Sequence, residues 1–373
     1  MSGDMRLDVA ERDAVYLWDL GGGRFARVSS TAHQLLRLRA DGVSFDEIAR
    51  RLGGSGAAWA ATTHAGLVAR LDELRRRPRR DRAFLLRLRV LSAARVQAIA
   101  RRLAPLYRRT IALPLALLSL AAIAWSLPRG GLPAATPGAI AVGYALFIAS
   151  LLVHELGHAS ASAWFGRPPS EIGAALYLVY PAFYSDVSQA WALRRGARVV
   201  VDLGGVYFQL AFIAALGVGW RASGWAPFGA AAWMSLASAA LSINPIFRFD
   251  GYWVLSDLIG VANLDSQPLR LLGIAWSRLR RRRVARLPWS GATTAAVAIY
   301  GIVSQTIWAA FAISLGPMAW REGRRFGHAV ATLAAHHAAA DLLAMARAAL
   351  VVVAALWLAA RFIGAVARTL RPA

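Results

Sequence analysis

The feature that most constrains this chain is a series of apolar segments, each close to 20 residues long. A helix needs about 20 apolar residues to cross roughly 30 Å of hydrocarbon, so the series predicts an all-α polytopic membrane protein. Six transmembrane helices are expected, at 111–127, 139–163, 199–218, 226–247, 295–315 and 346–366. The segment 171–184 is apolar but short and contains Pro181, which favours a re-entrant or interfacial strand pair over another span.

Arginine supplies all of the positive side-chain charge, because the chain has no lysine, and the net charge is +23. Arginine beside apolar spans is typical of cytosolic loops, so the excess does not indicate nucleic acid as a partner. The loops 164–198 and 248–294 and the tail from Arg361 carry 15 arginines, against 5 in the opposite loops. This difference predicts that the N- and C-termini are cytosolic and that the main partner is the lipid bilayer.

Two missing residue types narrow the chemistry. The chain has no cysteine, which excludes a disulfide scaffold, a thiolate nucleophile and thiolate-ligated zinc. The absence of lysine excludes catalysis by a lysine amine. A metal site in this chain must therefore be built from histidine and carboxylate ligands.

Residues 1–82 lack the apolar segment of a signal peptide and are expected to form a small soluble, cytosolic domain. Two β-rich runs on either side of Gly21–Gly23 predict a hairpin. A helix is expected after Ser29, a second one after a capping box that starts at Ser44, and a third over about 57–76. The order of elements indicates a winged-helix-like α+β domain.

The arginine-rich segment 83–110 cannot cross a bilayer and is interpreted as a juxtamembrane linker. Contact with the anionic cytosolic leaflet and a solvated linker both fit its charge. The remaining residues, 111–373, are expected to form the transmembrane domain.

The residues that carry chemistry lie late in the second expected span, where His154, Glu155 and His158 form the pattern H-E-x-x-H. On a helix, residues i and i+4 share a face, so both imidazoles can reach one metal ion, with Glu155 beside them as a base. Ionisable residues within a span are costly and are usually functional. The pattern therefore predicts a zinc site.

A catalytic zinc normally has three protein ligands and a water, so a third ligand is expected. Asp250 follows the fourth span, where Pro245 should break the helix and Gly251 permits a turn that aims the carboxylate into the bundle. The arginine-derived topology places it at the depth of the histidine pair. Asp186 and Asp202 are the competing ligands, and Asp202 also fits a structural role.

These residues resemble the site-2 protease family of intramembrane zinc metalloproteases, in which H-E-x-x-H precedes an Asn-Pro-x-x-x-x-Asp-Gly segment by some 90 residues. The resemblance implies that His154, His158 and Asp250 bind one zinc ion and that Glu155 is the general base. The wider likeness covers roughly 84–315. It includes Tyr-Pro-Ala-Phe-Tyr-Ser-Asp-Val and Phe-Asp-Gly-Tyr-Trp, which resemble the bacterial branch called peptide zinc metalloproteases. It implies a protein of the bacterial inner (cytoplasmic) membrane.

Residues 11–76 look like a PqqD-like domain, which implies binding of a leader peptide as an added β-strand. The resemblance as a whole implies cleavage of a membrane-associated or secreted peptide, in the maturation or export of a ribosomally made peptide. An extended substrate could pair with the 171–184 segment. The chain departs from the family at Gly204-Gly205-Val206, which lacks the usual proline and implies a straighter helix. Gln209 fits either an oxyanion donor or an interhelical hydrogen bond.

Two alternatives to a protease stay open at this point. The first is a non-proteolytic protein that binds or exports peptides and keeps zinc for structure. The second is a transporter that uses the intramembrane acids and histidines for ions. Zinc proteases whose third ligand is a glutamate fit badly, because only Glu171 and Glu322 follow Glu155 and neither lies in a suitable context.

Overall fold

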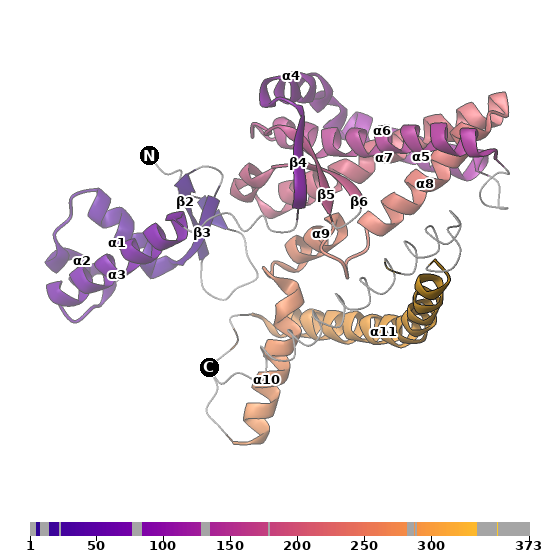
Figure 1. Ribbon diagram of the computed structural model, residues 1–373. Coiled ribbons are helices and arrows are strands. Elements are labelled where there is room, and N and C mark those ends of the chain that lie inside the picture. Colours follow the sequence, from indigo (N-terminus) through magenta and orange to yellow (C-terminus); the bar gives the residue numbers. More distant parts are fainter. Residues whose placement is uncertain are drawn as a thin grey trace. The chain divides into compact units, whose positions relative to one another are not determined.

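The computed structural model describes residues 5–7, 15–21, 24–76, 84–127, 135–177, 180–281, 287, 289–333 and 349. Within these residues the chain is mostly helical and contains two small antiparallel sheets (Figure 1). The chain divides into two compact units, 1–262 and 263–373.

The polar N-terminal segment folds as the sequence predicts. Strands β1 (Met5–Leu7), β2 (Val15–Gly21) and β3 (Arg24–Ser29) pair in that order, and helices α1 (Ser30–Ala40), α2 (Phe45–Leu52) and α3 (Ala57–Arg76) follow. Ser29 and Ser44 each accept a hydrogen bond from a backbone N–H three residues on, and Gly53 ends α2 with a φ of 69°. The hairpin and all three helices are thus confirmed, whereas the winged-helix assignment stays a prediction.

Four helices are long and apolar enough to cross a membrane, as judged by length and composition within the described residues. They are α5 (Arg109–Ser126), α6 (Pro137–Trp164), α7 (Arg195–Ser223) and the first 20 residues of α11 (Gly291–Leu333). The shorter helix α8 (Ala226–Ser242) packs against α6 and α7. Small residues bring these helices together, as where Gly143 meets Ala230. The chain is therefore a helical membrane protein by composition and architecture.

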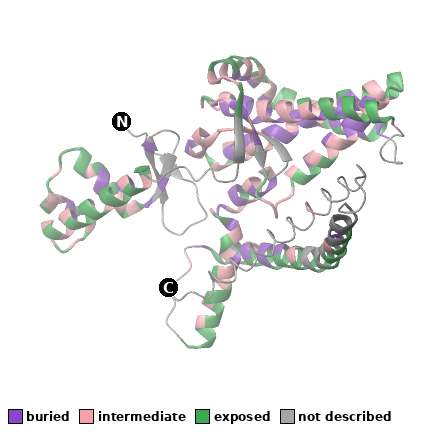
Figure 2. Ribbon diagram, in the orientation of Figure 1, coloured by how far each residue is buried: buried purple, intermediate pink, exposed green. Residues whose placement is uncertain are grey.

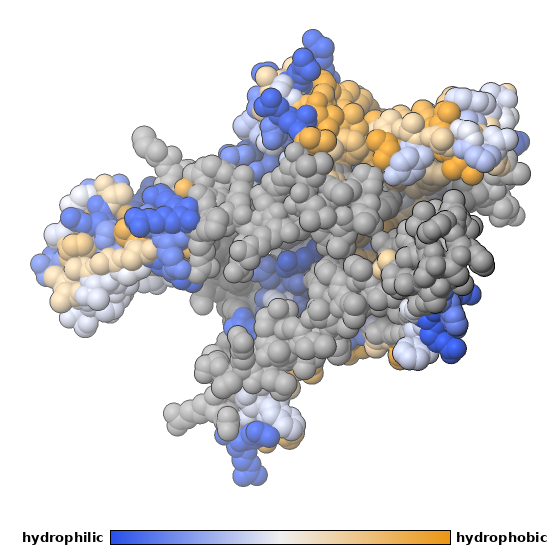
Figure 3. Space-filling view, in the orientation of Figure 1, coloured by the Kyte–Doolittle hydropathy of each residue, from blue (hydrophilic) through white to orange (hydrophobic). Residues whose placement is uncertain are grey.

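The outer surface of these helices suits lipid. Leu113, Leu117 and Leu118 of α5 are exposed. Figure 3 shows hydrophobic side chains gathered over the part of the molecule where α5 and α6 lie, and Figure 2 shows exposed residues along the same helices. An exposed apolar surface of this kind is stable when hydrocarbon covers it.

The structure differs from the expected spans after residue 315. A loop is predicted from residue 316, and this prediction is wrong, because α11 continues through Pro317 to Leu333. An ion pair of 2.6 Å between Glu322 and Arg325, three residues apart, supports helix in this polar stretch. The sixth expected span, 346–366, lies outside the described residues apart from position 349. Six spans thus stay a prediction.

The second sheet contains the expected strand pair. It also includes a strand from the segment 83–110, which is expected from the sequence to be a linker. Strands β5 (Ile172–Tyr177) and β6 (Tyr180–Ser185) are joined by β4 (Phe84–Leu91), in the order β4-β5-β6. Leucine and arginine alternate along β4, which is the period of a strand rather than of an unstructured linker. Helix α4 (Ala93–Leu103) and the 3-10 turn η1 (Ala104–Tyr107) follow β4. Val96, Ala159 and Ile172 pack together and hold this sheet and α4 against α6.

The segment expected as a long cytosolic loop, 248–294, also contains regular structure. It holds α9 (Asp250–Ile259), the turn η3 (Leu264–Ser266) and α10 (Gln267–Leu279), and another turn, η2 (Ser188–Ala192), precedes α7. Helix α9 packs against α7 in the first unit, and α10 packs against α11 in the second. The contact between α7 and α9 determines where Asp250 lies.

Candidate metal centre

Helix α6 presents the two histidines to the same point. Nε2 of His154 lies 3.1 Å from Nε2 of His158, and the ring planes make an angle of 76°. Both side chains are buried, and the helix that carries them is apolar enough to cross a membrane. The i, i+4 spacing thus gives the shared face that the sequence predicts.

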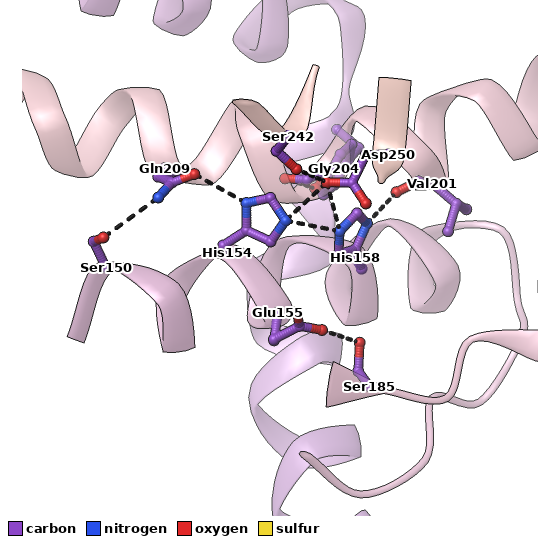
Figure 4. A network of polar contacts seen from close by, with 11 residues as sticks. Ser150, His154, Glu155, His158, Ser185, Val201, Gly204, Gln209, Ser242 and Asp250 are labelled. Atoms are coloured by element: carbon purple, nitrogen blue, oxygen red, sulfur yellow. Dashed lines mark hydrogen bonds and ion pairs between the residues drawn. The ribbon is translucent and has the colours of Figure 1, made fainter. Parts of the chain in front are cut away.

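Asp250 completes the group from a distant part of the chain. Its Oδ2 lies 2.9 Å from Nε2 of His154 and 3.5 Å from Nε2 of His158 (Figure 4). The three ligand atoms all lie within 4.8 Å of one another, which is close enough for one ion to touch all three. Ser242, at the end of α8, donates a hydrogen bond of 2.7 Å to the same oxygen of Asp250.

Asp250 reaches this point because the helical structure is interrupted between α8 and α9. Helix α8 ends at Ser242, the next residues form turns, and Asp250 is the first residue of α9. Gly251 matters for a different reason from the one expected. It does not adopt a positive φ, but a Cβ atom there would overlap the carbonyl group of Ile243. The glycine therefore permits a close approach of two backbone segments rather than a left-handed turn.

A buried ion pair fixes α9 in place. The guanidinium of Arg198, on α7, binds both carboxylate oxygens of Asp257, on α9, at 2.7 and 2.8 Å. Arg195 also donates to the backbone carbonyl of Asp257. Bidentate pairs of this kind impose a defined geometry, so they hold the helix that begins with Asp250 against the helix beside the histidines. From the sequence, Arg198 is expected only as a loop arginine, and no spacing signal links it to Asp257.

The Nδ1 atom of each imidazole, which points away from Asp250, makes a hydrogen bond. Nδ1 of His158 lies 2.8 Å from the backbone carbonyl oxygen of Val201, and Nδ1 of His154 lies 3.1 Å from Oε1 of Gln209. Since a carbonyl oxygen only accepts hydrogen bonds, each Nδ1 carries the proton and each Nε2 presents a lone pair inward. Gln209 thus makes an interhelical hydrogen bond, the second of the two roles expected for it.

A short chain of polar groups supports Gln209. Its Nε2 donates to Oγ of Ser150 at 3.4 Å, and Ser235 of α8 donates to the same oxygen at 2.8 Å. These residues tie α6, α7 and α8 together behind His154. Because buried polar groups are costly unless they are paired, the network fixes the side-chain orientation of Gln209.

The space around the ligands is shaped by glycine. A Cβ atom at Gly205 would overlap Nε2 of both His154 and His158, and one at Gly157 would overlap the carbonyl of Gly204. Tyr107 donates to the carbonyl of Gly157 at 2.8 Å where these two helices cross. The sequence shows the glycines of the third span but not that they make room for the imidazoles.

The donor set fits a divalent metal. Two inward imidazole nitrogens and one carboxylate oxygen are the ligands of many catalytic zinc sites, and each imidazole has the outer-shell partner that such ligands normally have.

The competing ligands do not join this group. Asp186 caps the turn that follows β6, where its Oδ1 accepts from the backbone N–H of Ser188 at 3.0 Å. Asp202 lies on α7, and its buried Oδ2 has no hydrogen-bond partner within the part of the chain that the structure describes. Among the described residues, the group of three metal-binding side chains consists of His154, His158 and Asp250.

Glu155 lies next to the ligands in sequence but turns toward the sheet. Its Oε2 accepts a hydrogen bond of 2.7 Å from Oγ of Ser185, the last residue of β6. Figure 4 shows this carboxylate on the side of α6 that faces Ser185, while the imidazoles point toward Asp250. The contact connects the expected base to the strand pair, and no sequence pattern predicts it.

Comparison with known proteins gives a partial match to a metalloprotease. The curated protein "Putative peptide zinc metalloprotease protein YydH" of Bacillus subtilis (strain 168) is 30% identical over 111 residues. The matched stretch covers 29% of this chain and 44% of that protein, so the chain spans less than half the length of this curated relative. No family model and no solved structure matches the chain. The His-His-Asp group of this chain could hold a metal ion, and the relative's name refers to zinc.

Proposed function

We propose that this protein is an intramembrane zinc endopeptidase of the site-2 type, which cleaves a membrane-associated or secreted peptide. The observation that carries the proposal is the convergence of the inward Nε2 atoms of His154 and His158 with Oδ2 of Asp250, and Glu155 follows His154 in the sequence. Structural zinc sites fill all four positions with protein ligands, whereas three ligands leave a position for a water or a substrate.

The reaction would be divided among few groups. A zinc ion held by His154, His158 and Asp250 would polarise the peptide carbonyl and lower the pKa of an attacking water toward about 7. Glu155 would take the proton from this water and pass it to the leaving amine nitrogen. Gln209 keeps one imidazole in the tautomer that faces inward.

The substrate must be extended, because a peptide bond within a helix is shielded from attack. In the order β4-β5-β6, strand β6 is one of the two edge strands of the described sheet, and its last residue contacts Glu155. A peptide added along this edge would run toward the base. This arrangement supports the proposal that the 171–184 segment receives the substrate.

The N-terminal domain, residues 1–82, would bind the leader peptide of a ribosomally made precursor. Strand β3 lies at the edge of the described sheet β1-β2-β3, which leaves room for an added strand. A pocket of about 290 Å³ between β2, α1 and α3 lies in the same domain, with Trp18, Leu36 and Val68 among its lining residues. The proposed maturation or export of such a peptide fits both features.

The proposed location is the bacterial cytoplasmic membrane, with both termini in the cytosol. The arginine-rich loops 164–198 and 248–294 support this orientation. The test is a reporter fused after Leu333, at the end of α11, which should be extracytoplasmic by the expected topology. A cytosolic reporter would refute the six-span arrangement.

The catalytic role is tested by separating metal binding from cleavage. The Glu155→Gln variant should keep about one zinc per chain and lose at least about 100-fold in the rate of peptide processing. Asp250→Asn should lose the zinc, and the matched control Asp186→Asn should keep both zinc and processing. Full processing by cells that contain only Glu155→Gln would contradict the proposal.

A second candidate is a non-proteolytic, zinc-containing protein that binds or exports peptides. The hydrogen bond between Glu155 and Ser185 favours it, because the carboxylate is held away from the ligand atoms in this structure. This candidate also expects one zinc per chain. It differs in that Glu155→Gln would leave both zinc content and peptide handling unchanged.

A further inference from the structure

Helix α10 carries an apolar stripe that is exposed among the described residues of its own unit. Leu272, Trp276 and Leu279 lie on one side of the helix at spacings of four and three residues, and their exposed fractions are 63%, 55% and 76%. Figure 2 shows α10 as a largely exposed helix, and it is too short and polar to rank among the membrane-spanning helices. Exposure of three such side chains in a row is unfavourable in water.

Helix α10 packs within its own unit at its first turn and along the side turned away from the stripe. Pro268, four residues before Leu272, lies against Gly301 of α11, and Leu271 and Ile274 are half-buried. Among the described residues, the side chains of Leu272, Trp276 and Leu279 stay exposed beyond these contacts.

Positive charge surrounds the stripe. Arg270, Arg278, Arg280 and Arg281 are exposed along α10 and at its end, and Arg282 and Arg283 follow in the sequence. The guanidinium of Arg280 lies 4.6 Å from the ring centroid of Trp276. Tryptophan and arginine gather where hydrocarbon meets phosphate headgroups, because each has an apolar body and a polar end.

We propose that α10 lies in the plane of the membrane surface, with its apolar stripe in the acyl region and its arginines on anionic lipid headgroups. An amphipathic helix with an apolar side and an arginine-rich polar side is the usual architecture for such a site. The positive charge favours anionic lipid over a second copy of this chain as the binding partner of α10. A second copy would bring the same arginines, and the two sets would repel each other. The proposal rests on the proposed membrane location and orientation, but not on proteolysis.

Binding of α10 to lipid would affect the metal centre through the polypeptide that connects α10 to α9. Helix α10 follows α9 after the short turn η3, and α9 begins with Asp250. A lipid-held α10 would restrain the segment that follows the third ligand. Anionic lipid is therefore expected to be a structural partner of this protein.

The absence of cysteine makes the test direct. Leu272→Cys in the full-length chain would carry an environment-sensitive fluorophore in vesicles of equal phosphatidylcholine and phosphatidylglycerol. The matched control is Gly273→Cys, one residue away and turned by about 100° around the helix, where a Cβ atom meets nothing within 4 Å. A label at Leu117→Cys on α5 reports correct membrane insertion.

Brominated lipid should quench the label at position 272 strongly, and iodide in water should quench the label at 273. Brominated phosphatidylglycerol should be enriched over brominated phosphatidylcholine near position 272 by about fivefold for each arginine engaged. Combining Arg270→Gln, Arg278→Gln and Arg280→Gln should abolish this enrichment.

Three results would overturn the proposal. Equal quenching of positions 272 and 273 by iodide would place α10 in water. Quenching of 272 by neither agent would mean that protein covers the stripe. Equal quenching by the two brominated lipids would remove the role of anionic headgroups. Loss of lipid quenching at 117 as well would instead refute the membrane location itself, which separates the two failures.

Discussion

Replacement of Gly205 by alanine should destroy the metal site while leaving the fold intact. The new methyl carbon would lie 2.5 Å from Nε2 of His158 and closer still to Nε2 of His154, whereas ordinary contacts begin at 3.4 Å. The rings must therefore move by roughly 1 Å. They are not free to do so, because Gln209 and Val201 hold their Nδ1 atoms.

The size of the effect follows from this geometry. Loss of one outer-shell partner typically costs 10- to 100-fold in metal affinity, and Gly205→Ala disturbs both imidazoles at once. We therefore expect zinc affinity to fall by at least about 100-fold, or about 2.7 kcal/mol. The helix itself should not suffer, because alanine is favoured over glycine in helices by up to about 1 kcal/mol.

The assay is competition for zinc between the purified full-length protein and a chromophoric chelator, with thermal unfolding measured in parallel. The matched control is Gly196→Ala, which lies on the same helix and where a Cβ atom meets nothing within 4 Å. Gly196→Ala should bind zinc like the wild type. If Gly205→Ala binds zinc equally tightly, the ligands do not lie as described.

Three further predictions concern the surrounding groups. Gln209→Leu should weaken zinc binding by about 10- to 100-fold in the same competition assay, since one imidazole loses its hydrogen-bond acceptor; unchanged affinity would contradict the tautomer assignment. Arg198→Met should leave the carboxylate of Asp257 buried and unpaired and lower the free energy of unfolding by about 3–5 kcal/mol, with partial recovery in the double variant with Asp257→Leu; a thermal unfolding temperature like that of the wild type would refute the pair's role in holding α9. Ser185→Ala should keep the zinc but alter the rate of peptide cleavage, because Glu155 loses its hydrogen bond; an unchanged pH–rate profile would show that this contact is only structural.

The local patterns of the sequence predicted the elements that depend on near neighbours. Ser29 and Ser44 mark the starts of two N-terminal helices because capping involves residues only three apart. The pairing of His154 with His158 follows from helical periodicity alone. Pro245 predicts the end of a helix, and in the structure α8 ends just before it, at Ser242.

Features that depend on long-range packing were not predictable from one sequence. The arginines of β4 indicate a linker in solvent or on the anionic leaflet, and its partner strand lies about 85 residues away in the sequence. The pair between Arg198 and Asp257 joins residues 59 apart, which no local spacing reveals. The same applies to Gly205, whose importance follows from the position of two rings on another helix. Each case requires the contact between helices or strands to be known first.

The central claim is that His154, His158 and Asp250 bind a common zinc ion. X-ray absorption spectroscopy of the zinc-loaded, full-length protein tests it most directly. The account predicts one zinc per chain with two imidazole nitrogens and carboxylate or water oxygens at about 2.0–2.2 Å, and loss of this signal in Asp250→Ala. A spectrum with fewer than two imidazoles, or one that Asp250→Ala leaves unchanged, would contradict the account.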